Sequence, residues 1–519
     1  MPQSSDSATA LSAGDSHRTT TRAARTRFAP SPTGFQHIGG FRTALFSWLL
    51  ARHTGGHFLL RIEDTDTART VPGAVEAVIE GFKWLGLDID EGPEVGGPYG
   101  PYFQTQRRDL YLAYAEQLIA GGHAYRCFCS PERLQRVREE QRSHGEPPRY
   151  DRHCRYLTAD DIAARLNEGQ GFTVRLASPT SGKTIVKDAL RSEIVFENAS
   201  LDDAVLLKSN GLPTYHLASV IDDHLMLITH VLRAEEWIPS APLHLITYRA
   251  LGWEPPIFAH VPDVLSAQGG KKLSKRFGAI PMLEYRDRGF LPQALVNYMA
   301  LLGWSYDDKS NVLSREELVA AFDLDRVGVA PARYDEERLL WFNGYYIRQL
   351  SPEELTERAM PFMERAEAEG GLPDSVARPL DRSYTARVLR LEQERMKTLA
   401  EAPGMTSFFF VTDVTYEPQM LIAKNMDAAR TLDGLRRSYD ALSAFADWEA
   451  APMEARLREL VAELGLKPVQ LFTSLRVAVT GRTVSPPLFE TMETLGRPTS
   501  MRRLALAIDA LRAHTAGAE

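Results

Sequence analysis

The chain has 519 residues, 44% hydrophobic and 25% charged, which is typical of a globular protein and too long for a single core. No apolar run approaches the roughly 20 residues of a membrane span, and three cysteines cannot form a disulfide framework, so we expect a cytoplasmic protein that touches no membrane. Sixty Lys and Arg against 68 Asp and Glu give a net charge of −8, which excludes overall attraction to nucleic acid, so any RNA-binding surface must be local.

The first elements predict a βαβ unit after a polar tail. Residues 1–22 are rich in Ser, Thr and Ala and lack the hydrophobic segment of a secretion signal, so we expect a disordered tail. A strand at 26–29 precedes a helix with apolar residues spaced through 41–49. A strand at 57–62 and an amphipathic helix at 75–85 follow.

From about residue 104 the order of elements changes. A helix that ends at Gly121, a helix capped by Ser130 and short strands such as 172–176 predict an insertion into the sheet domain. The apolar segment 225–231 predicts that the parallel sheet resumes, and a helix at 243–251 follows it. After residue 282 the period is helical nearly everywhere, with the clearest amphipathic stretches at 292–302, 336–350, 352–366 and 454–464.

Two segments more than two hundred residues apart indicate a nucleotide site. The first, Ser-Pro-Thr-Gly-Phe-Gln-His-Ile-Gly-Gly at 31–40, lies between a strand and a helix, where N–H groups and the helix dipole favour phosphate. The second, Lys-Lys-Leu-Ser-Lys-Arg at 271–276, is a cationic loop. Each alone is typical of a solvated surface. Their order and separation predict a triphosphate site with one fixed wall and one that can close.

These segments resemble the HIGH and KMSKS signatures of class I aminoacyl-tRNA synthetases. With Arg-Phe-Ala-Pro-Ser-Pro-Thr-Gly at 27–34 and Arg-Ile-Glu-Asp-Thr-Asp at 61–66, the chain resembles the glutamyl-tRNA synthetase family. The resemblance implies an α/β fold: a Rossmann-type parallel-sheet catalytic domain with an α+β acceptor-stem insertion, then all-α C-terminal anticodon-binding domains. It also implies ATP and Mg²⁺ as cofactors, and L-glutamate and tRNA-Glu as partners. Glutamyl-adenylate would form first, and the 3′ end of the tRNA would then take the glutamyl group.

The elements and the resemblance together predict the domain boundaries, and we expect a monomer. In chain order the expected parts are a tail at 1–22, the two catalytic halves at 23–103 and 220–265 with the acceptor-stem domain 104–219 between them, a stem-contact domain at 266–350, and helical anticodon-binding domains at 351–414 and 415–519.

Other classes of protein fit less well. A glutamine-specific synthetase shares the motifs but ends in β-barrels, and a truncated paralogue that glutamylates a modified base lacks the helical third. A small-molecule adenylate-forming ligase would have no use for that third. A catalytically silent RNA-binding protein is disfavoured by His37, Glu63 and Lys275, all of which are present. Charging of tRNA-Gln as well as tRNA-Glu stays open.

Activation of a carboxylic acid by ATP needs positioning and charge stabilisation on the phosphates rather than a side-chain nucleophile. We expect His37, Lys272 and Lys275 to be catalytic, and Mg²⁺ to come with the nucleotide. The residues that the resemblance assigns to ATP are His37, Gly39, Gly40, Glu236, Leu265, Lys272, Ser274 and Lys275.

The amino-acid pocket must match two carboxylates and one ammonium. Arginine suits carboxylates because its planar fork makes paired, charge-assisted hydrogen bonds. The resemblance gives the carboxylates to Arg27 and Arg233 and the ammonium to Glu63. The full set assigned to glutamate is Arg27, Ala29, Ser31, Glu63, Tyr215, Ser219 and Arg233. Two points stay open: Ser219 replaces the family's Asn, and Arg233 could instead pair with Glu235 or Glu236.

Cys127, Cys129, Tyr150 and Cys154 have the spacing of a zinc site seen in some synthetases of this kind. The pattern is weak, because Cys-x-Cys is not the usual knuckle and the fourth ligand would be Tyr150 or His153. Reduced, metal-free cysteines are an equal alternative.

Arg395 resembles the arginine that glutamate-specific members present to the third anticodon base. A solvated helix residue paired with Glu392 or Glu394 is the alternative.

Overall fold

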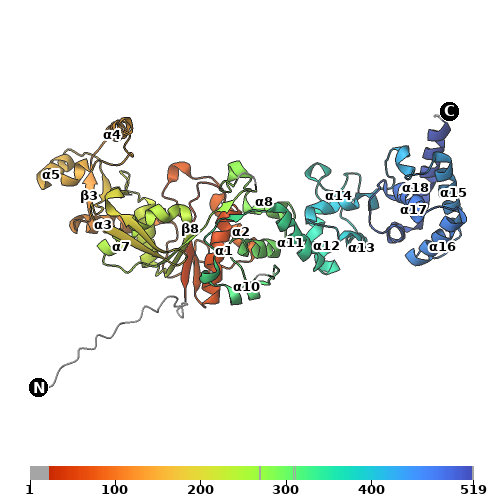
Figure 1. The fold of residues 1–519 in the computed structure, drawn as a ribbon, viewed down its shortest axis with the longest axis horizontal. Helices are drawn as coiled ribbons and strands as arrows, with labels where there is room; N and C mark the ends of the chain where they lie inside the picture. Colours follow the sequence, from red (N-terminus) through yellow and green to blue (C-terminus); the bar gives the residue numbers. More distant parts are fainter. Residues whose placement is uncertain (1–22, 268–269, 308, 310, 517–519) are drawn as a thin grey trace, which may run out of the picture. The chain divides into compact units, whose positions relative to one another are not determined.

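The computed structural model describes residues 23–267, 270–307, 309 and 311–516 (Figure 1). The expected tail at 1–22 lies outside the described residues. The chain divides into two compact units. The first contains the residues up to Leu283 together with Val296–Asp335, and the second contains Glu284–Leu295 and Glu336–Glu519. In the described part of the chain, no helix is long and apolar enough to cross a membrane.

The first unit opens with the predicted βαβ unit. Strands β1 (Arg25–Phe28) and β2 (His57–Leu60) are parallel neighbours joined through α1 (Ile38–His53), and α2 (Ala74–Leu85) follows. Helix α1 is buried along nearly its whole length, as a helix packed against a sheet requires. Phe82 of α2 fixes this packing, with ring centroids 5.3–5.9 Å from those of Phe28, Phe41 and Phe58.

A second sheet has four strands in the order β6-β5-β9-β8. Strands β8 and β9 come from the expected second catalytic half, whereas β5 and β6 come from within the range 104–219 that was predicted as the insertion. Strands β8 (His230–Ala234) and β9 (Ile257–Val261) are parallel, with α7 (Ala241–Ala250) between them in the chain. Strand β5 (Lys183–Asp188) pairs in parallel with β9 and forms an antiparallel hairpin with β6 (Ser192–Glu197). The parallel α/β architecture is therefore confirmed.

One predicted strand is wrong in its first half. The segment 225–231 begins inside a helix, because α6 (Tyr215–Leu225) continues through two aspartates that are buried against arginines. The chain then turns at Leu227, whose φ is 57°, and β8 begins only at His230. The Thr229 amide donates to the Arg25 carbonyl over 2.9 Å, which brings β8 beside β1.

The insertion is a mixed α+β unit, as predicted. Its strands form an antiparallel sheet in the order β3-β4-β7, and Ser130 caps α4 by accepting a hydrogen bond from the Arg133 amide over 3.3 Å. Its elements are α3 (Arg108–Ala120), β3 (Ala124–Cys127), α4 (Pro131–Ser143), α5 (Ala159–Asn167), β4 (Thr173–Leu176) and β7 (Val205–Leu207).

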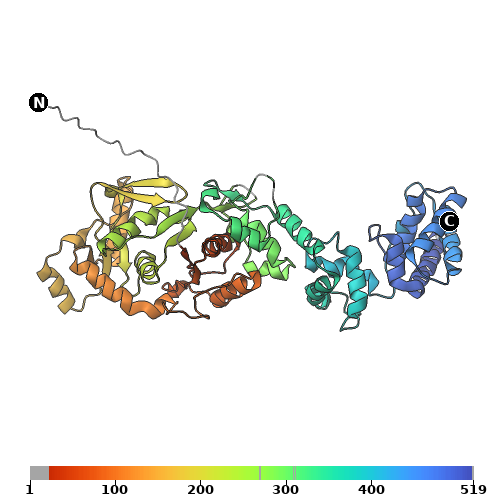
Figure 2. The same ribbon diagram turned by 90° about the horizontal axis from the view of Figure 1, so that it is seen from below.

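Beyond the catalytic sheet the chain becomes helical, which confirms the predicted all-α C-terminal part. From α11 (Glu336–Arg348) onward, the described residues contain helices without a strand, and Figure 2 draws this segment, coloured from green-cyan to blue, without a strand arrow. The elements after β9 are β10 (Val264–Leu265), α8 (Met282–Asp287), α9 (Pro292–Ala300), α10 (Arg315–Ala321), β11 (Ala332–Arg333), α11 (Glu336–Arg348), α12 (Pro352–Met363), α13 (Arg382–Glu392), α14 (Ala402–Thr406), α15 (Ala428–Ser443), α16 (Ala450–Glu463), α17 (Pro468–Thr480) and α18 (Leu488–Ala516).

Candidate active site

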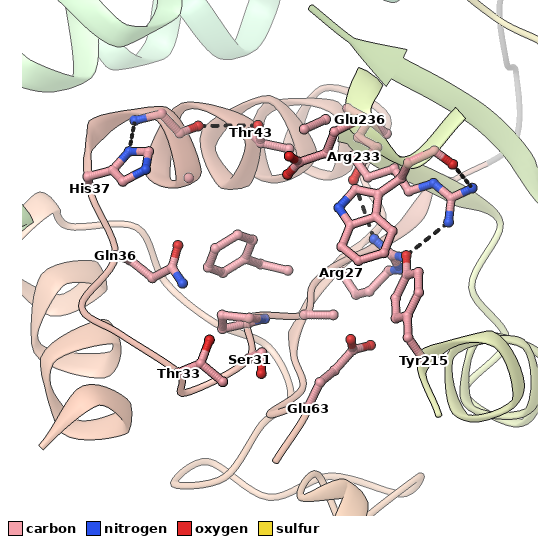
Figure 3. Close-up of a pocket in the computed structure, with 18 of the residues that line it drawn as sticks. Arg27, Ser31, Thr33, Gln36, His37, Thr43, Glu63, Tyr215, Arg233 and Glu236 are labelled. Carbon is pink, nitrogen blue, oxygen red and sulfur yellow. Dashed lines mark hydrogen bonds between the residues drawn. The ribbon is translucent and has the colours of Figure 1, made fainter. Parts of the chain in front are cut away.

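A cavity of about 620 Å³ opens at the carboxyl ends of β1 and β8, beside the start of α1. Parallel α/β sheets bind their ligands at this edge. Figure 3 shows Arg27, Tyr215 and Arg233 on one side of the cavity, and Gln36 and His37 on the other. The predicted site residues that line it are Arg27, Ala29, Ser31, His37, Gly39, Gly40, Glu63, Tyr215, Arg233, Glu236 and Lys272.

His37 caps α1 at the rim of the cavity. Its Nδ1 accepts a hydrogen bond from the Gly39 amide over 3.1 Å. A Cβ on Gly39 would lie 3.0 Å from the His37 ring, and one on Gly40 would lie 2.4 Å from the Gln36 side-chain oxygen, so a larger residue at either position would have to displace those side chains. The result is a helix N-terminus that a phosphate can approach closely.

A buried ion network forms the floor of the opposite end. Asp223 accepts hydrogen bonds from Arg27 Nε over 3.1 Å and from Arg61 over 2.7 Å, and Arg61 also pairs with Glu63 over 3.2 Å. The side chain of Arg61 is fully buried. The position of Arg27 is therefore set by a carboxylate that lies in a different half of the sheet domain.

Asp222 extends this network toward the insertion. Its carboxylate accepts from Arg107 over 2.7 Å, from Tyr111 over 2.8 Å and from Gln104 over 2.9 Å. All four side chains are buried. The segment that leads into α3 and α3 itself are thus held to α6 by a buried ion pair and hydrogen bonds.

Glu63 is the acid of this network whose ionised form is destabilised by burial. Burial raises the pKa of its carboxyl to about 7, even though Arg61 and Arg27 act in the opposite direction. A carboxylate with so little solvation favours a cationic partner, and Glu63 faces the cavity.

Arg233 is held differently from Arg27. Its Nε donates to His260 Nε2 over 3.0 Å, and its other nitrogens donate to Tyr215 OH over 2.9 Å, His244 over 3.1 Å and the Trp237 carbonyl over 3.4 Å. Among the described residues, no carboxylate forms an ion pair with it. The ion-pair alternative is wrong, because Glu235 pairs with Arg191 and Glu236 with Lys272, each over 2.5 Å.

Lys272 also lines the cavity. Its ammonium contacts Glu236 over 2.5 Å and Asp263 over 3.0 Å. Burial alone would lower the pKa of Lys272, but these two carboxylates outweigh burial and raise it. The two carboxylates therefore favour the protonated form of Lys272.

Four predicted residues do not line the cavity or are not described there. Ser219 donates its hydroxyl to the Tyr215 carbonyl over 2.7 Å, within its own helix. Leu265 lies in β10 and forms a β-bridge with Lys272, and Ser274 precedes the short 3₁₀ helix Lys275–Phe277. The side chain of Lys275 lies outside the described part of the chain.

Several residues that line the cavity belong to no motif recognised in the sequence. Lys208, from the insertion, donates to the Thr65 carbonyl over 2.9 Å, and the Trp237 ring packs 4.2 Å from that of Tyr215. Gln104 joins Asp222 to Glu63 across 2.9 and 3.5 Å. Nothing local in the sequence distinguishes such residues, because their neighbours in the cavity come from remote segments.

The three cysteines converge in the insertion. The Sγ atoms of Cys127, Cys129 and Cys154 lie within 4.8 Å of one another, and Tyr150 OH lies 3.3 Å from Cys127 and 3.5 Å from Cys129. Tetrahedral zinc with Zn–S bonds of about 2.3 Å places its sulfurs about 3.8 Å apart, which this cluster accommodates. Hydrogen bonding with Cys154 lowers the pKa of the Cys127 thiol to about 4 against the effect of burial. The donor set fits a metal with Tyr150 as the fourth group, and the exposed His153 is not part of it.

Arg395 follows α13 and forms an ion pair with Glu392 over 2.8 Å. Its side chain is 41% exposed, whereas Glu392 is nearly inaccessible at 2%. The guanidinium is thus anchored at one end and open to solvent at the other.

Comparison with known proteins identifies the family. Residues 23–341 match the family model of class I tRNA synthetases (E and Q), catalytic domain, and residues 354–508 match an anticodon binding domain. The parallel sheet and its cavity agree with that class.

Relatives narrow the class. The chain is 49% identical over 488 residues to a glutamate–tRNA ligase of Dehalococcoides mccartyi, covering 94% of this chain and 98% of that one, and 48% identical over 494 residues to one of Roseiflexus castenholzii, covering 94% and 97%. A crystal structure of a glutamate tRNA ligase from Elizabethkingia meningosepticum in complex with its amino acid is 34% identical, with a TM-score of 0.85, and covers 94% of this chain and 100% of that chain. The chain belongs to the glutamate–tRNA ligase family of class I tRNA synthetases.

Glu63→Gln is expected to stabilise the ligand-free protein at pH 8. A carboxyl whose folded pKa lies above its ordinary 4.5 favours folding below pH 4.5, and this contribution is lost as pH rises through about 7. The raised pKa corresponds to at most about 3 kcal/mol of folding free energy, which the wild type loses at high pH. The amide of Glu63→Gln does not ionise and so does not lose it. Thermal unfolding of the ligand-free protein at pH 5 and pH 8 measures the effect.

The stabilisation by Glu63→Gln should shrink toward pH 5, whereas Glu193→Gln, an exposed change on β6, should have little effect at either pH. A wild type that is more stable than Glu63→Gln at pH 8 would contradict the desolvation of Glu63.

Proposed function

We propose that this chain is a glutamate–tRNA ligase, which uses ATP to form glutamyl-adenylate from L-glutamate and transfers the glutamyl group to the 3′ end of tRNA-Glu, releasing AMP and diphosphate. The observation that carries the proposal is Arg233: a buried cation at the cavity wall whose described partners are all neutral. Such a group attracts a ligand carboxylate and disfavours a neutral amide.

Glutamate would be bound by complementary charge. Arg233 and Tyr215 would bind one carboxylate of glutamate. Arg27 would bind the other, which would compete with Asp223 for the Arg27 guanidinium. Glu63 would accept the α-ammonium, which replaces the solvation that burial removes. Ser31 and Ala29 line the same wall, and Ser219 would act only through water or through the Tyr215 helix.

ATP would lie toward the start of α1. The phosphates of ATP would contact the helix N-terminus at His37, Gly39 and Gly40. Mg²⁺ bound to the nucleotide would neutralise part of the phosphate charge. The glutamate carboxylate then attacks the α-phosphorus while pyrophosphate leaves. Because no protein nucleophile takes part, rate depends on position and on charge stabilisation.

The cationic loop would stabilise the leaving pyrophosphate. Lys272 would exchange Glu236 and Asp263 for phosphate oxygens, and Lys275 would join it. Leu265 and Ser274, which belong to the flanking strand and loop, would contact the nucleotide from the same side.

The tRNA would be bound by the remaining domains, in a cytoplasmic monomer. We assign the acceptor stem to 104–219, a contact with the tRNA stem to 266–350 and the anticodon to 351–414 and 415–519. The anticodon-domain match over 354–508 supports the last assignment.

Lys275→Ala is expected to lower the rate of ATP–pyrophosphate exchange by orders of magnitude with little change in the KM for glutamate, because the ammonium acts on charge that develops only as pyrophosphate leaves. Exchange is measured with glutamate or glutamine, with and without total tRNA. Lys83→Ala, a change at an exposed lysine on α2, is the matched control. An exchange rate within about threefold of wild type would remove the loop assignment.

We further propose that the cysteine cluster with Tyr150 holds one structural Zn²⁺. Protein purified without chelator should contain about one zinc per chain by elemental analysis, and Cys129→Ser should lack it. Chelation should reduce tRNA charging before it affects adenylate formation, because the cluster lies in the insertion. Addition of chelator should not reduce tRNA charging by Cys129→Ser any further. Wild type without zinc would leave the metal-free alternative.

Arg395 is proposed to distinguish tRNA-Glu from tRNA-Gln. A guanidinium donates to the acceptors of a cytosine but meets a donor on the Watson–Crick edge of guanine. Wild type should therefore charge purified tRNA-Glu far better than tRNA-Gln, and Arg395→Gln should lose much of that preference. Arg390→Gln, on the exposed face of α13, is the matched control. Equal charging of both tRNAs by wild type would instead indicate a non-discriminating enzyme.

A further inference from the structure

Arg233 is the end of a chain of buried side chains that crosses three neighbouring strands. Arg233 on β8 and His260 on β9 are direct partners in the parallel register, and Asp188 ends β5, next to β9. His260 Nε2 lies 3.0 Å from Arg233 Nε, and His260 Nδ1 lies 2.5 Å from Asp188 Oδ2. His260 is inaccessible and Asp188 is 5% exposed.

Hydrogen bonding fixes the protons in this chain. Asp188 accepts from the amides of Leu190, Arg191 and His260 as well as from the His260 ring. Burial would raise the pKa of Asp188, but the bonds from His260 outweigh it and lower it, so Asp188 is ionised. Its charge keeps the His260 proton on Nδ1, because that nitrogen faces a carboxylate oxygen. His260 Nε2 is then an acceptor for Arg233, which can only donate.

A neutral imidazole can orient Arg233 without the opposing charge that a carboxylate in its place would supply. Burial lowers the pKa of His260, so the ring holds the guanidinium edge without cancelling its charge. His244, whose pKa burial also lowers, faces another nitrogen of Arg233 in the same way. Arg27 provides the contrast, since Asp223 contacts it directly. The charge of Arg233 thus remains available to a ligand while its orientation is fixed.

We propose that Asp188 and His260 are positioning residues that hold Arg233 for the side-chain carboxylate of glutamate and so set the preference for glutamate over glutamine. This inference rests on the proposed function. It also assigns a role to the β5–β6 hairpin, whose last β5 residue, Asp188, supplies the charge that orients a group in the cavity.

Two substitutions of one residue separate positioning from general support. In His260→Gln the side-chain oxygen replaces Nε2 as the acceptor for Arg233, whereas in His260→Asn the amide replaces Nδ1, keeps the bond to Asp188 and cannot reach Arg233. Exchange with tRNA present should show a KM for glutamate raised about tenfold or more in His260→Asn, and much less in His260→Gln. The KM for ATP and kcat should stay near wild type in both, and His260→Asn should lose more of the glutamate-to-glutamine preference.

His230 provides the matched control. It is a buried histidine on β8 whose ring contacts Thr229 and not Arg233, so His230→Gln should leave the KM for glutamate and the amino-acid preference unchanged.

Asp188→Asn tests the other half of the chain. Its amide would donate to Nδ1 and move the ring proton to Nε2, which then faces the Arg233 donor. The KM for glutamate should rise as in His260→Asn, and the rise should be smaller in the His260→Gln background because no ring tautomer remains to be changed.

The outcomes separate this inference from the proposed function. Wild type without glutamate-dependent exchange would overturn the proposed function. Active wild type with equal KM values for glutamate in His260→Asn and His260→Gln, or with KM changes for ATP as large as those for glutamate, would overturn the positioning role alone.

Discussion

The site depends on the pairing of buried charges at Asp222 and Asp223. These neighbours on α6 accept from Arg27, Arg61 and Arg107, and Glu63 joins them through Arg61. The three arginines and three acids compensate one another, which is the condition for keeping charge in a dry place. Loss of Asp222 or Asp223 would leave buried arginines unpaired, which typically costs about 3–5 kcal/mol. The network joins both catalytic halves to the start of the insertion, so the cavity and the domain arrangement share one constraint.

The cavity uses three kinds of charge compensation. Arg27 is neutralised by direct contact with Asp223, and Arg233 is held by neutral acceptors. Lys272 is paired with the exposed Glu236 and the partly buried Asp263. The first arrangement gives rigidity, the second leaves an uncancelled cation for a ligand, and the third is readily exchanged because the groups are partly solvated. Position within the cavity therefore determines how strongly each cation can act on a bound molecule.

Catalysis in such a site needs little from any single side chain. Attack of a carboxylate on the α-phosphorus requires alignment and dispersal of charge, and the structure offers fixed donors at the start of α1 facing fixed cations at the ends of β1 and β8. Glu63 shows the cost of this arrangement, since burial raises its pKa to about 7 in the ligand-free protein. A cationic ligand would relieve that cost.

The sequence by itself determined the βαβ opening, the insertion, the helical C-terminal part and the two motif segments at 31–40 and 271–276, because each rests on local periodicity, a cap or a motif. It could not place the strand at 225–231, since the burial of Asp222 and Asp223 that extends α6 comes from arginines far away in the chain. For the same reason Gln104 and Lys208 were not recognised as cavity residues, and the neutral partners of Arg233 were not foreseen. Only the tertiary structure decided these points, because the electrostatic state of a buried group is set by contacts between segments that the linear pattern does not relate.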